Sequence, residues 1–325
     1  MNFDVFGMDM PCLDLNVVIP EMPERNTGTR VQDLSWQGGG KVSTGICACA
    51  RLGAKCTWSG VVGDDLYGRF LYKDFLDHGV DLTGAKIREG QTTSLDVVVS
   101  EKDHNTRSLL FKAGTFAQLK PEEADWELLR SARWFFLSGI DETVEEGLRI
   151  ARQNGVQTFI DADYDSPKLR EHIGDIDVFV GSEFVFDALF PGAKQKGLLN
   201  LQEELEQVHA QGPRIVVFTF GERGAVGLED GTYFHVPAFR VDAVDTVGAG
   251  DVFHGAFLAE LLKGSSAYEC TVFASAAAAI KCTRIGGRSA IPTREVLENF
   301  LKTGTIDYTE IDQRTAYYRR AIDYV

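Results

Sequence analysis

A repeated order of strand and then helix is the feature that most restricts the fold of this 325-residue chain. Small residues over 41–52 predict a tightly packed helix, an alternating apolar run predicts a strand over 56–62, and helical periodicity returns over 67–76. The same order recurs between residues 134 and 220. Parallel neighbouring strands need a crossover element such as a helix between them. The sequence therefore predicts an α/β protein with a mostly parallel central sheet.

One stretch breaks this alternation. Residues 93–100 and 108–112 are β-rich runs joined by the polar turn 101–105, which predicts a hairpin with no helix between its strands. Together with the extended run 13–19, these strands are expected to form a small sheet that projects from the main body as a lid. Such a lid would exclude water from a reacting site.

The composition narrows the functional classes. No apolar run reaches the length of a membrane span, and residues 1–4 lack the basic start of a secretion signal, so a cytoplasmic protein without a membrane partner is expected. The formal net charge of −15 comes with no concentrated basic stretch, which argues against a nucleic-acid partner. The six cysteines lack metal-ligand spacing and are interpreted as reduced core residues.

Residues 245–251 read Asp-Thr-Val-Gly-Ala-Gly-Asp and precede a run with helical apolar spacing. Gly248 and Gly250 carry no Cβ, so their N–H groups can approach a phosphate closely at the positive end of the following helix. Asp251 would repel that anion, and we expect it to hold a metal or to accept a proton from an attacking hydroxyl. The structural alternative is a capped helix in which Asp245 or Asp251 merely satisfies amides. The pattern favours phosphoryl transfer.

These seven residues resemble the C-terminal signature of the ribokinase-like (PfkB) carbohydrate kinases. Residues 38–44, Gly-Gly-Gly-Lys-Val-Ser-Thr, and the later Arg-Leu-Gly at 51–53 resemble the N-terminal signature of the same family. The resemblance implies a ribokinase-like three-layer sandwich, with residues 1–325 forming a single kinase domain and a lid built from roughly 13–36 and 92–115.

The resemblance also implies the reaction: an ATP-dependent sugar kinase that uses Mg²⁺ and transfers the γ-phosphoryl group to a hydroxyl of a small carbohydrate. Asp251 would be the general base, and backbone amides next to it would hold the charge that grows on the phosphate oxygens. The candidate catalytic residues are Gly248, Ala249, Gly250 and Asp251.

Several residues are candidates for binding the sugar. Asp14 matches an aspartate of the family's first strand that accepts hydrogen bonds from substrate hydroxyls, although Asp9 competes for this role and either could cap a turn. Thr44 stands where the family usually has Asn, which leaves the sugar open. Lys41 and Arg107 are candidates for orienting a sugar or a phosphate that it already bears. The candidate substrate-binding residues are Asp14, Gly39, Gly40, Lys41, Thr44 and Arg107.

Three other places resemble the family's nucleotide site. The turn Thr-x-Gly-x-x-Gly at 219–224 follows a predicted buried strand, where ligands of parallel sheets bind. The alanine-rich helix around Ser275 resembles the helix that flanks adenine. Glu183 is shifted by two residues from the family's magnesium-organising glutamate, so it either takes over that role or is an N-terminal helix charge. The candidate nucleotide-binding residues are Thr219, Gly221, Gly224, Ser275 and Glu183.

A monovalent cation, K⁺, is a further possibility that the resemblance raises. Asp245, Val247 and Gly286 match the place where many relatives bind such an ion through backbone oxygens. A glycine turn after a well-packed alanine helix explains the same residues without an ion.

Two other functions stay open. A nucleoside kinase of the same family would need aromatic stacking from Trp36, Phe111 or Phe116, each of which is also explained by packing of the lid. A sugar-binding or regulatory protein that has lost turnover is the second alternative, although the intact Asp251 argues against it. The unpaired edge of the lid is, in addition, a candidate surface for a homodimer.

Overall fold

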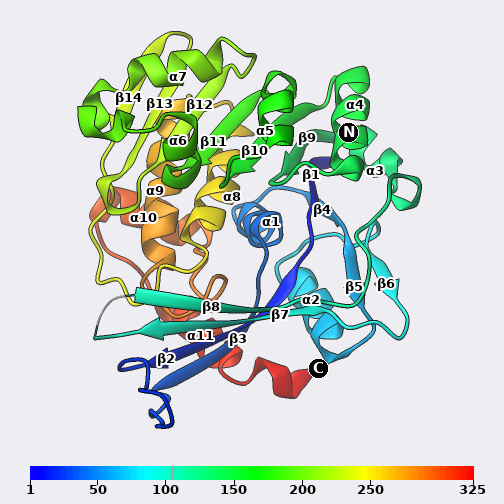
Figure 1. The fold of residues 1–325 in the computed structure, drawn as a ribbon, viewed down its shortest axis with the longest axis vertical. Helices are drawn as coiled ribbons and strands as arrows, with labels where there is room; N and C mark the ends of the chain where they lie inside the picture. Colours follow the sequence, from blue (N-terminus) through cyan, green and yellow to red (C-terminus); the bar gives the residue numbers. More distant parts are fainter. Residues whose placement is uncertain (104–105) are drawn as a thin grey trace.

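The computed structural model describes residues 1–103 and 106–325, so His104 and Asn105 of the predicted hairpin turn lie outside the described residues. Its main body is an eight-stranded sheet (Figure 1). The six strands from β12 to β4 run parallel to one another, while β13 and β14 add an antiparallel edge next to β12. The strands, in sheet order, are β14 (Thr232–Val236), β13 (Ala225–Glu229), β12 (Ile215–Thr219), β11 (Val178–Ser182), β10 (Gln157–Ala162), β9 (Ala132–Leu137), β1 (Phe3–Met8) and β4 (Cys56–Ser59).

Helices cover both faces of this sheet. One face is packed by α1, α8 and α9, and the other by α3, α4, α6 and α7. A cluster of buried apolar side chains fills each interface. The predicted three-layer α/β architecture is confirmed. The helices are α1 (Lys41–Arg51), α2 (Leu66–Asp77), α3 (Trp126–Arg130), α4 (Glu142–Asn154), α5 (Pro167–His172), α6 (Glu183–Leu189), α7 (Gln202–His209), α8 (Ala249–Leu261), α9 (Ala267–Lys281), α10 (Arg294–Thr303) and α11 (Thr309–Tyr318).

The predicted β lid is also present. It is a four-stranded sheet that crosses below the main body in Figure 1. Its two central strands are parallel, and each outer strand pairs antiparallel with one of them. In sheet order these strands are β3 (Asp33–Gly38), β2 (Cys12–Ile19), β7 (Ser94–Glu101) and β8 (Thr106–Lys112).

Strand β3 lacks the apolar alternation that identifies a half-buried strand, because polar side chains occupy its buried positions. Ser35 and Gln37 are both 0% exposed. The Gln37 side chain donates to the Ile285 carbonyl oxygen (2.8 Å) and accepts from the backbone N–H groups of Arg288 (2.7 Å) and Ser289 (2.9 Å). These bonds join the lid to the loop that follows α9.

The single strand expected over 56–62 is wrong. The strand is interrupted at Gly60, where the chain changes from one sheet to another. β4 joins the main sheet, while β5 (Val61–Gly63) pairs with β6 (Lys86–Arg88). A Cβ at Gly60 would lie 2.2 Å from the Trp58 ring and 2.6 Å from the Asp9 carbonyl oxygen, so only glycine fits the break. Helices α10 and α11 follow the last predicted element. None of the described helices has the length and apolar character needed to cross a membrane.

Candidate active site

Asp251 lies in the first turn of α8, where the positive end of the helix dipole is located. The helix begins after Gly248, whose φ of +71° is in the left-handed region that favours glycine. A Cβ at Gly248 would lie 2.7 Å from the Cα of Gly287, so the loop before α8 also packs closely on the loop after α9. The glycine is therefore required both for the turn and for this contact.

Close packing of α1 on α8 brings a lysine near Asp251. A Cβ at Gly255 would lie 2.0 Å from the Gly45 carbonyl oxygen, and a Cβ at Gly45 would lie 3.1 Å from the Asp251 carbonyl oxygen. Two glycines thus let the helix backbones approach. Lys41, the first residue of α1, interacts electrostatically with Asp251 as a result.

The surroundings of Asp251 make its carboxyl difficult to ionise. Burial raises its pKa well above the usual value, and the negative charges of Asp161 and Asp163 raise it further, against the opposing effect of Lys41. Lys41 itself forms an ion pair with Asp163 and lies 5.4 Å from the Tyr164 ring. A carboxylate with a raised pKa is a stronger proton acceptor, which is the property that a general base needs.

Asp161 and His254 form a buried pair behind Asp251. Asp161 is the last residue but one of β10, and its Oδ1 lies 3.4 Å from His254 Nε2. The other ring nitrogen of His254 lies 2.6 Å from the Gly250 carbonyl oxygen. Asp161 Oδ2 is buried and has no hydrogen-bond partner among the described residues. The sequence analysis gave neither residue a role. The available signal was an aspartate at the carboxyl end of a predicted parallel strand, where ligands bind.

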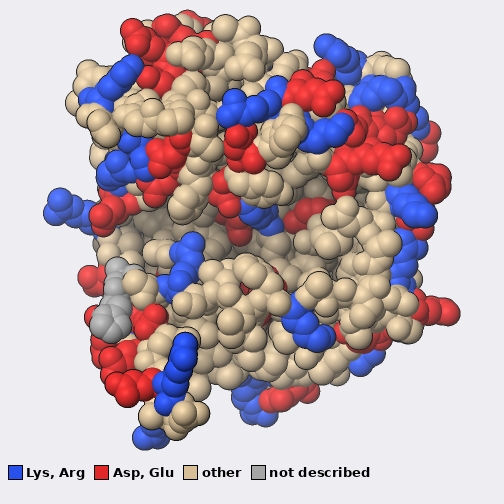
Figure 2. All heavy atoms as spheres, viewed as in Figure 1, with Lys and Arg blue, Asp and Glu red and all other residues tan. Residues whose placement is uncertain are grey.

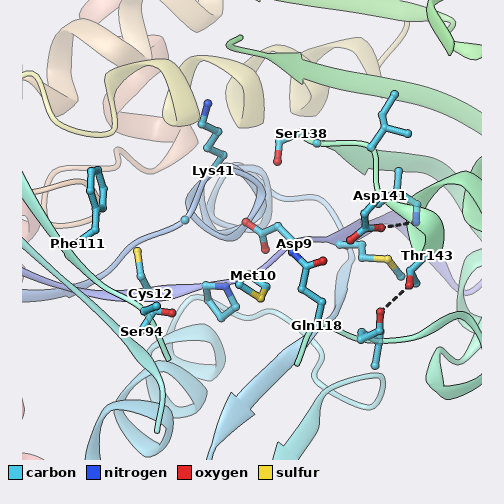
Figure 3. A pocket seen from close by; sticks show the side chains of 18 of the residues that line it. Asp9, Met10, Cys12, Lys41, Ser94, Phe111, Gln118, Ser138, Asp141 and Thr143 are labelled. Carbon is cyan, nitrogen blue, oxygen red and sulfur yellow. Dashed lines mark hydrogen bonds between the residues drawn. The ribbon is translucent and has the colours of Figure 1, made fainter. Parts of the chain in front are cut away.

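A cavity of about 550 Å³ lies between the lid and the main body. Asp251 is not among its described lining residues, but Lys41, which interacts electrostatically with Asp251, is one of them. Figure 2 shows the molecule hollowed on this face. In Figure 3, Asp9 and Gln118 lie near the centre of the view, with Lys41 and Phe111 on one side and Asp141 on the other. The polar and charged lining includes Asp9, Cys12, Lys41, Ser94, Asp96, Lys112, Gln118, Ser138, Asp141, Thr143 and Tyr164.

The two aspartates considered for the sugar have different surroundings. Asp9 lines the cavity, but its carboxylate accepts from Ser43 N (2.9 Å), Ser43 Oγ (2.5 Å) and Trp58 Nε1 (2.8 Å), so it holds the start of α1. Asp14 is 7% exposed and packs on Gly39, where a Cβ would lie 2.3 Å from its Oδ1. Burial raises the pKa of Asp14 to about 7, with a further contribution from Asp96.

The other predicted sugar-binding residues divide into two groups. Gly40 and Lys41 line the cavity. Thr44 and Arg107 are not among the described residues that line it, and neither are Asp14 and Gly39, so a role of these four in binding a sugar stays a prediction. The Thr44 hydroxyl is buried and accepts from Arg288 Nε (3.3 Å), while the exposed Arg107 donates from Nη1 to Thr246 Oγ1 (2.7 Å).

Arg288 is a residue whose role the sequence analysis missed. It is 0% exposed, pairs with Asp74 (2.7 Å) and donates to the Gly39 carbonyl oxygen (3.0 Å). It therefore connects α2, the start of α1 and the loop after α9. A lone arginine in a glycine turn gives no sequence signal for such a role.

The predicted nucleotide-binding residues lie mostly at the end of the parallel strands. Thr219 ends β12, and the turn after it closes with a hydrogen bond from Phe220 N to the Gly224 carbonyl oxygen (2.8 Å). Gly224 has a φ of +93°, and a Cβ there would lie 2.1 Å from the Val236 carbonyl oxygen. Gly221 also has a positive φ, of +57°. Ser275 lies on α9 and is partly exposed.

Glu183 is the first residue of α6, next to that turn. Its carboxylate accepts from Arg223 Nη2 (2.7 Å) and from Lys194 Nζ (3.5 Å). With its side chain 33% exposed, the carboxylate is accessible to a hydrated metal ion. Its position suits a helix charge and a metal role equally.

The three residues expected to bind a monovalent cation lie together. The Asp245 carboxylate accepts from Val247 N (3.0 Å) and from Gly286 N (2.8 Å). The Asp245 carbonyl oxygen, however, accepts from the ammonium of Lys281 (2.7 Å). A protein cation already occupies this part of the expected ion site.

Comparison with known proteins agrees with this geometry. The pfkB family carbohydrate kinase profile matches residues 5–294, which includes both glycine signatures, the lid and the turn after β12. The chain belongs to the PfkB family of carbohydrate kinases. It is therefore a phosphotransferase of the sugar and nucleoside kinase group, with an alcohol as acceptor.

Individual PfkB relatives are similar over nearly their whole length. An ATP-dependent ribose-1-phosphate kinase of Halopiger xanaduensis is 32% identical over 89% of this chain and 94% of its own length. An aminoimidazole riboside kinase of Salmonella typhimurium is 28% identical over 84% and 90%. The crystal structure of ribokinase from Thermotoga maritima superposes with a TM-score of 0.76 at 26% identity and covers 93% of this chain and 100% of that one.

Proposed function

We propose that this kinase transfers the γ-phosphoryl group of ATP to a hydroxyl of a small sugar, with Asp251 as the general base. The observation that carries the proposal is a carboxyl of raised pKa at the positive end of α8, next to a lysine that lines a polar cavity. A sugar hydroxyl at that edge of the cavity would lose its proton to Asp251 as it attacks the terminal phosphorus.

The chain supplies the charges that such a transfer needs. The backbone amides of Gly248 and Gly250 stabilise the charge on the transferring phosphoryl oxygens, whereas the N–H groups of Val247 and Ala249 are bonded to Asp245 and to the Thr246 carbonyl oxygen. Mg²⁺, when bound with ATP, neutralises the β and γ phosphates. Glu183 fits this ion because it offers an accessible carboxylate, and Mg²⁺ in proteins keeps several waters and uses only one or two such ligands.

A sugar without a phosphate group is favoured as acceptor. Of the two cations expected to recognise a phosphate, Arg107 does not line the cavity, and the charge of Lys41 is already paired with Asp163. Lys112 also lines the cavity, but its ammonium lies 6.0 Å from the centre of the Tyr67 ring. The remaining polar lining suits sugar hydroxyls. The ribose-1-phosphate kinase relative keeps phosphosugars among the acceptors to be tested.

A nucleoside acceptor is the second candidate. Phe111 lines the cavity and is 74% exposed, so its ring is available for stacking on a base. The riboside kinase relative supports the same class.

An ADP-release assay over pentoses, hexoses, phosphosugars and nucleosides tests these alternatives. We expect turnover with a neutral sugar. If no acceptor in the panel supports ADP release, the result would instead favour a binding protein that has lost turnover.

The role of Asp251 is tested by Asp251→Asn. We expect turnover to fall by about 10³-fold, because the amide cannot accept the proton, while ATP binding measured by calorimetry stays close to wild type. Asp323→Asn, an exposed substitution near the C-terminus, is the control for a changed charge. Normal turnover of the Asp251 variant would exclude it as the base.

We propose that the lid also provides a homodimer surface. Its outer strand β8 exposes Leu109 (41%), Leu110 (59%) and Phe111 (74%), and among the described strands it has a neighbour on one side only. An unpaired edge with apolar side chains favours pairing with a second chain. A mass of one chain in light scattering at micromolar concentration would contradict this.

A further inference from the structure

Lys281, the last residue of α9, is a fully buried lysine. Its side chain is 0% exposed, and its ammonium donates to the Asp245 carbonyl oxygen at 2.7 Å. A buried ammonium is costly unless neighbouring groups compensate for its lost hydration. Because Lys281 lies next to the loop that leads to Asp251, we expect its charge to have a role in that loop.

The groups around Lys281 form a rigid loop junction. Asp245 is itself 5% exposed, and its carboxylate holds the backbone N–H groups of Val247 and Gly286. The backbone N–H groups of Val244 and Asp245 donate to the Cys282 carbonyl oxygen (2.7 and 3.1 Å). The ammonium therefore holds one end of the loop whose other end is the start of α8.

A K⁺ ion does not fit this arrangement. The expected ion would use backbone oxygens at Asp245, Val247 and Gly286, but the Asp245 carbonyl oxygen is already bonded to a positive charge. A second cation would compete for that oxygen and be repelled by the ammonium. The covalently attached charge also has no binding entropy to lose, unlike a free ion.

We propose that the Lys281 ammonium takes the place of a monovalent cation and holds the loop 245–248 in position for catalysis. Lys281 is then a positioning residue, and the kinase does not depend on K⁺. This inference uses the proposed kinase reaction for one of its two measurements, and the second measurement needs no turnover.

The first measurement compares initial rates in KCl, NaCl and choline chloride at equal ionic strength. The wild type is expected to give rates within twofold of one another. Lys281→Met should lose at least tenfold in choline chloride and regain most of that loss in KCl or NH₄Cl, because a free cation can then enter. Lys263→Met, an exposed lysine after α8, should behave as the wild type.

The second measurement is the thermal unfolding midpoint of the protein without substrate. K⁺ should leave the midpoint of the wild type at its value in choline, and should raise that of Lys281→Met. Wild-type activation or stabilisation specific to K⁺ would overturn the inference, as would a Met variant equal to the wild type in choline in both measurements. If Lys281→Met does not fold, the wild-type comparison still decides. Failure to find any acceptor would reject the proposed function without affecting the unfolding test.

Discussion

Arg107 of lid strand β8 donates from Nη1 to Thr246 Oγ1 at 2.7 Å, so the lid touches the loop that leads to Asp251. The two residues are 139 positions apart in the chain. Because both are exposed, the bond adds little to global stability. Its position instead suits a contact that stabilises the lid in its place over the cavity.

Arg107→Ala should therefore weaken substrate binding more than chemistry. Losing one hydrogen bond of about 1 kcal/mol predicts a KM for the acceptor about fivefold higher, with kcat less affected. Steady-state kinetics with a saturating nucleotide measure this. Arg130→Ala, which breaks an exposed contact with Glu127, should leave both constants unchanged. If KM and kcat of the Arg107 variant equal those of the wild type, the contact does not hold the lid in place.

Asp161→Asn should move the acid limb of the pH profile to lower pH. Asp251 must be ionised to act as a base, so kcat/KM rises with pH through its pKa. Burial and the charge of Asp161 both raise that pKa, and removing the charge lowers it. Asp323→Asn serves as the control for net charge. An unmoved or upward-shifted limb would mean that Asp161 does not influence the base.

Arg288→Met should destabilise the fold by about 3–5 kcal/mol, because it leaves the buried carboxylate of Asp74 without its cation. Urea unfolding measures this loss. Adding Asp74→Asn to the variant should restore part of the stability, since the uncompensated charge is then removed. Arg320→Met, at an exposed position, should change stability little. A loss below about 1 kcal/mol for Arg288→Met would contradict the importance of this pair.

Glu183→Gln distinguishes the two roles considered for this residue. If its carboxylate organises Mg²⁺, the free Mg²⁺ needed for half-maximal rate should rise about tenfold at fixed ATP. Glu222→Gln, an exposed neighbour in the 221–224 turn, is the matched control. A normal Mg²⁺ requirement in the Glu183 variant would leave only the helix charge and its ion pair with Arg223.

The sequence alone was sufficient for the family and for the layered α/β architecture. Both rest on local signals: apolar periodicity marks the strands and helices, and the glycines at 38–40 and at 248 mark turns before helices. The strand break at Gly60 and the polar strand β3 were missed, because a close approach of distant groups decides each of them.

The sequence determined that Gly248, Gly250 and Asp251 stand together at the start of α8. Backbone N–H groups that no side chain shields therefore lie close to a carboxylate there. Only the tertiary structure decided the partners of the charged groups: Asp9 holds α1, Arg288 pairs with Asp74 across 214 residues, and Lys281 caps the Asp245 carbonyl. The physical reason is that periodicity and backbone conformation are set by near neighbours, whereas a buried charge is stabilised only by whichever opposite charge or dipole the packed chain brings beside it.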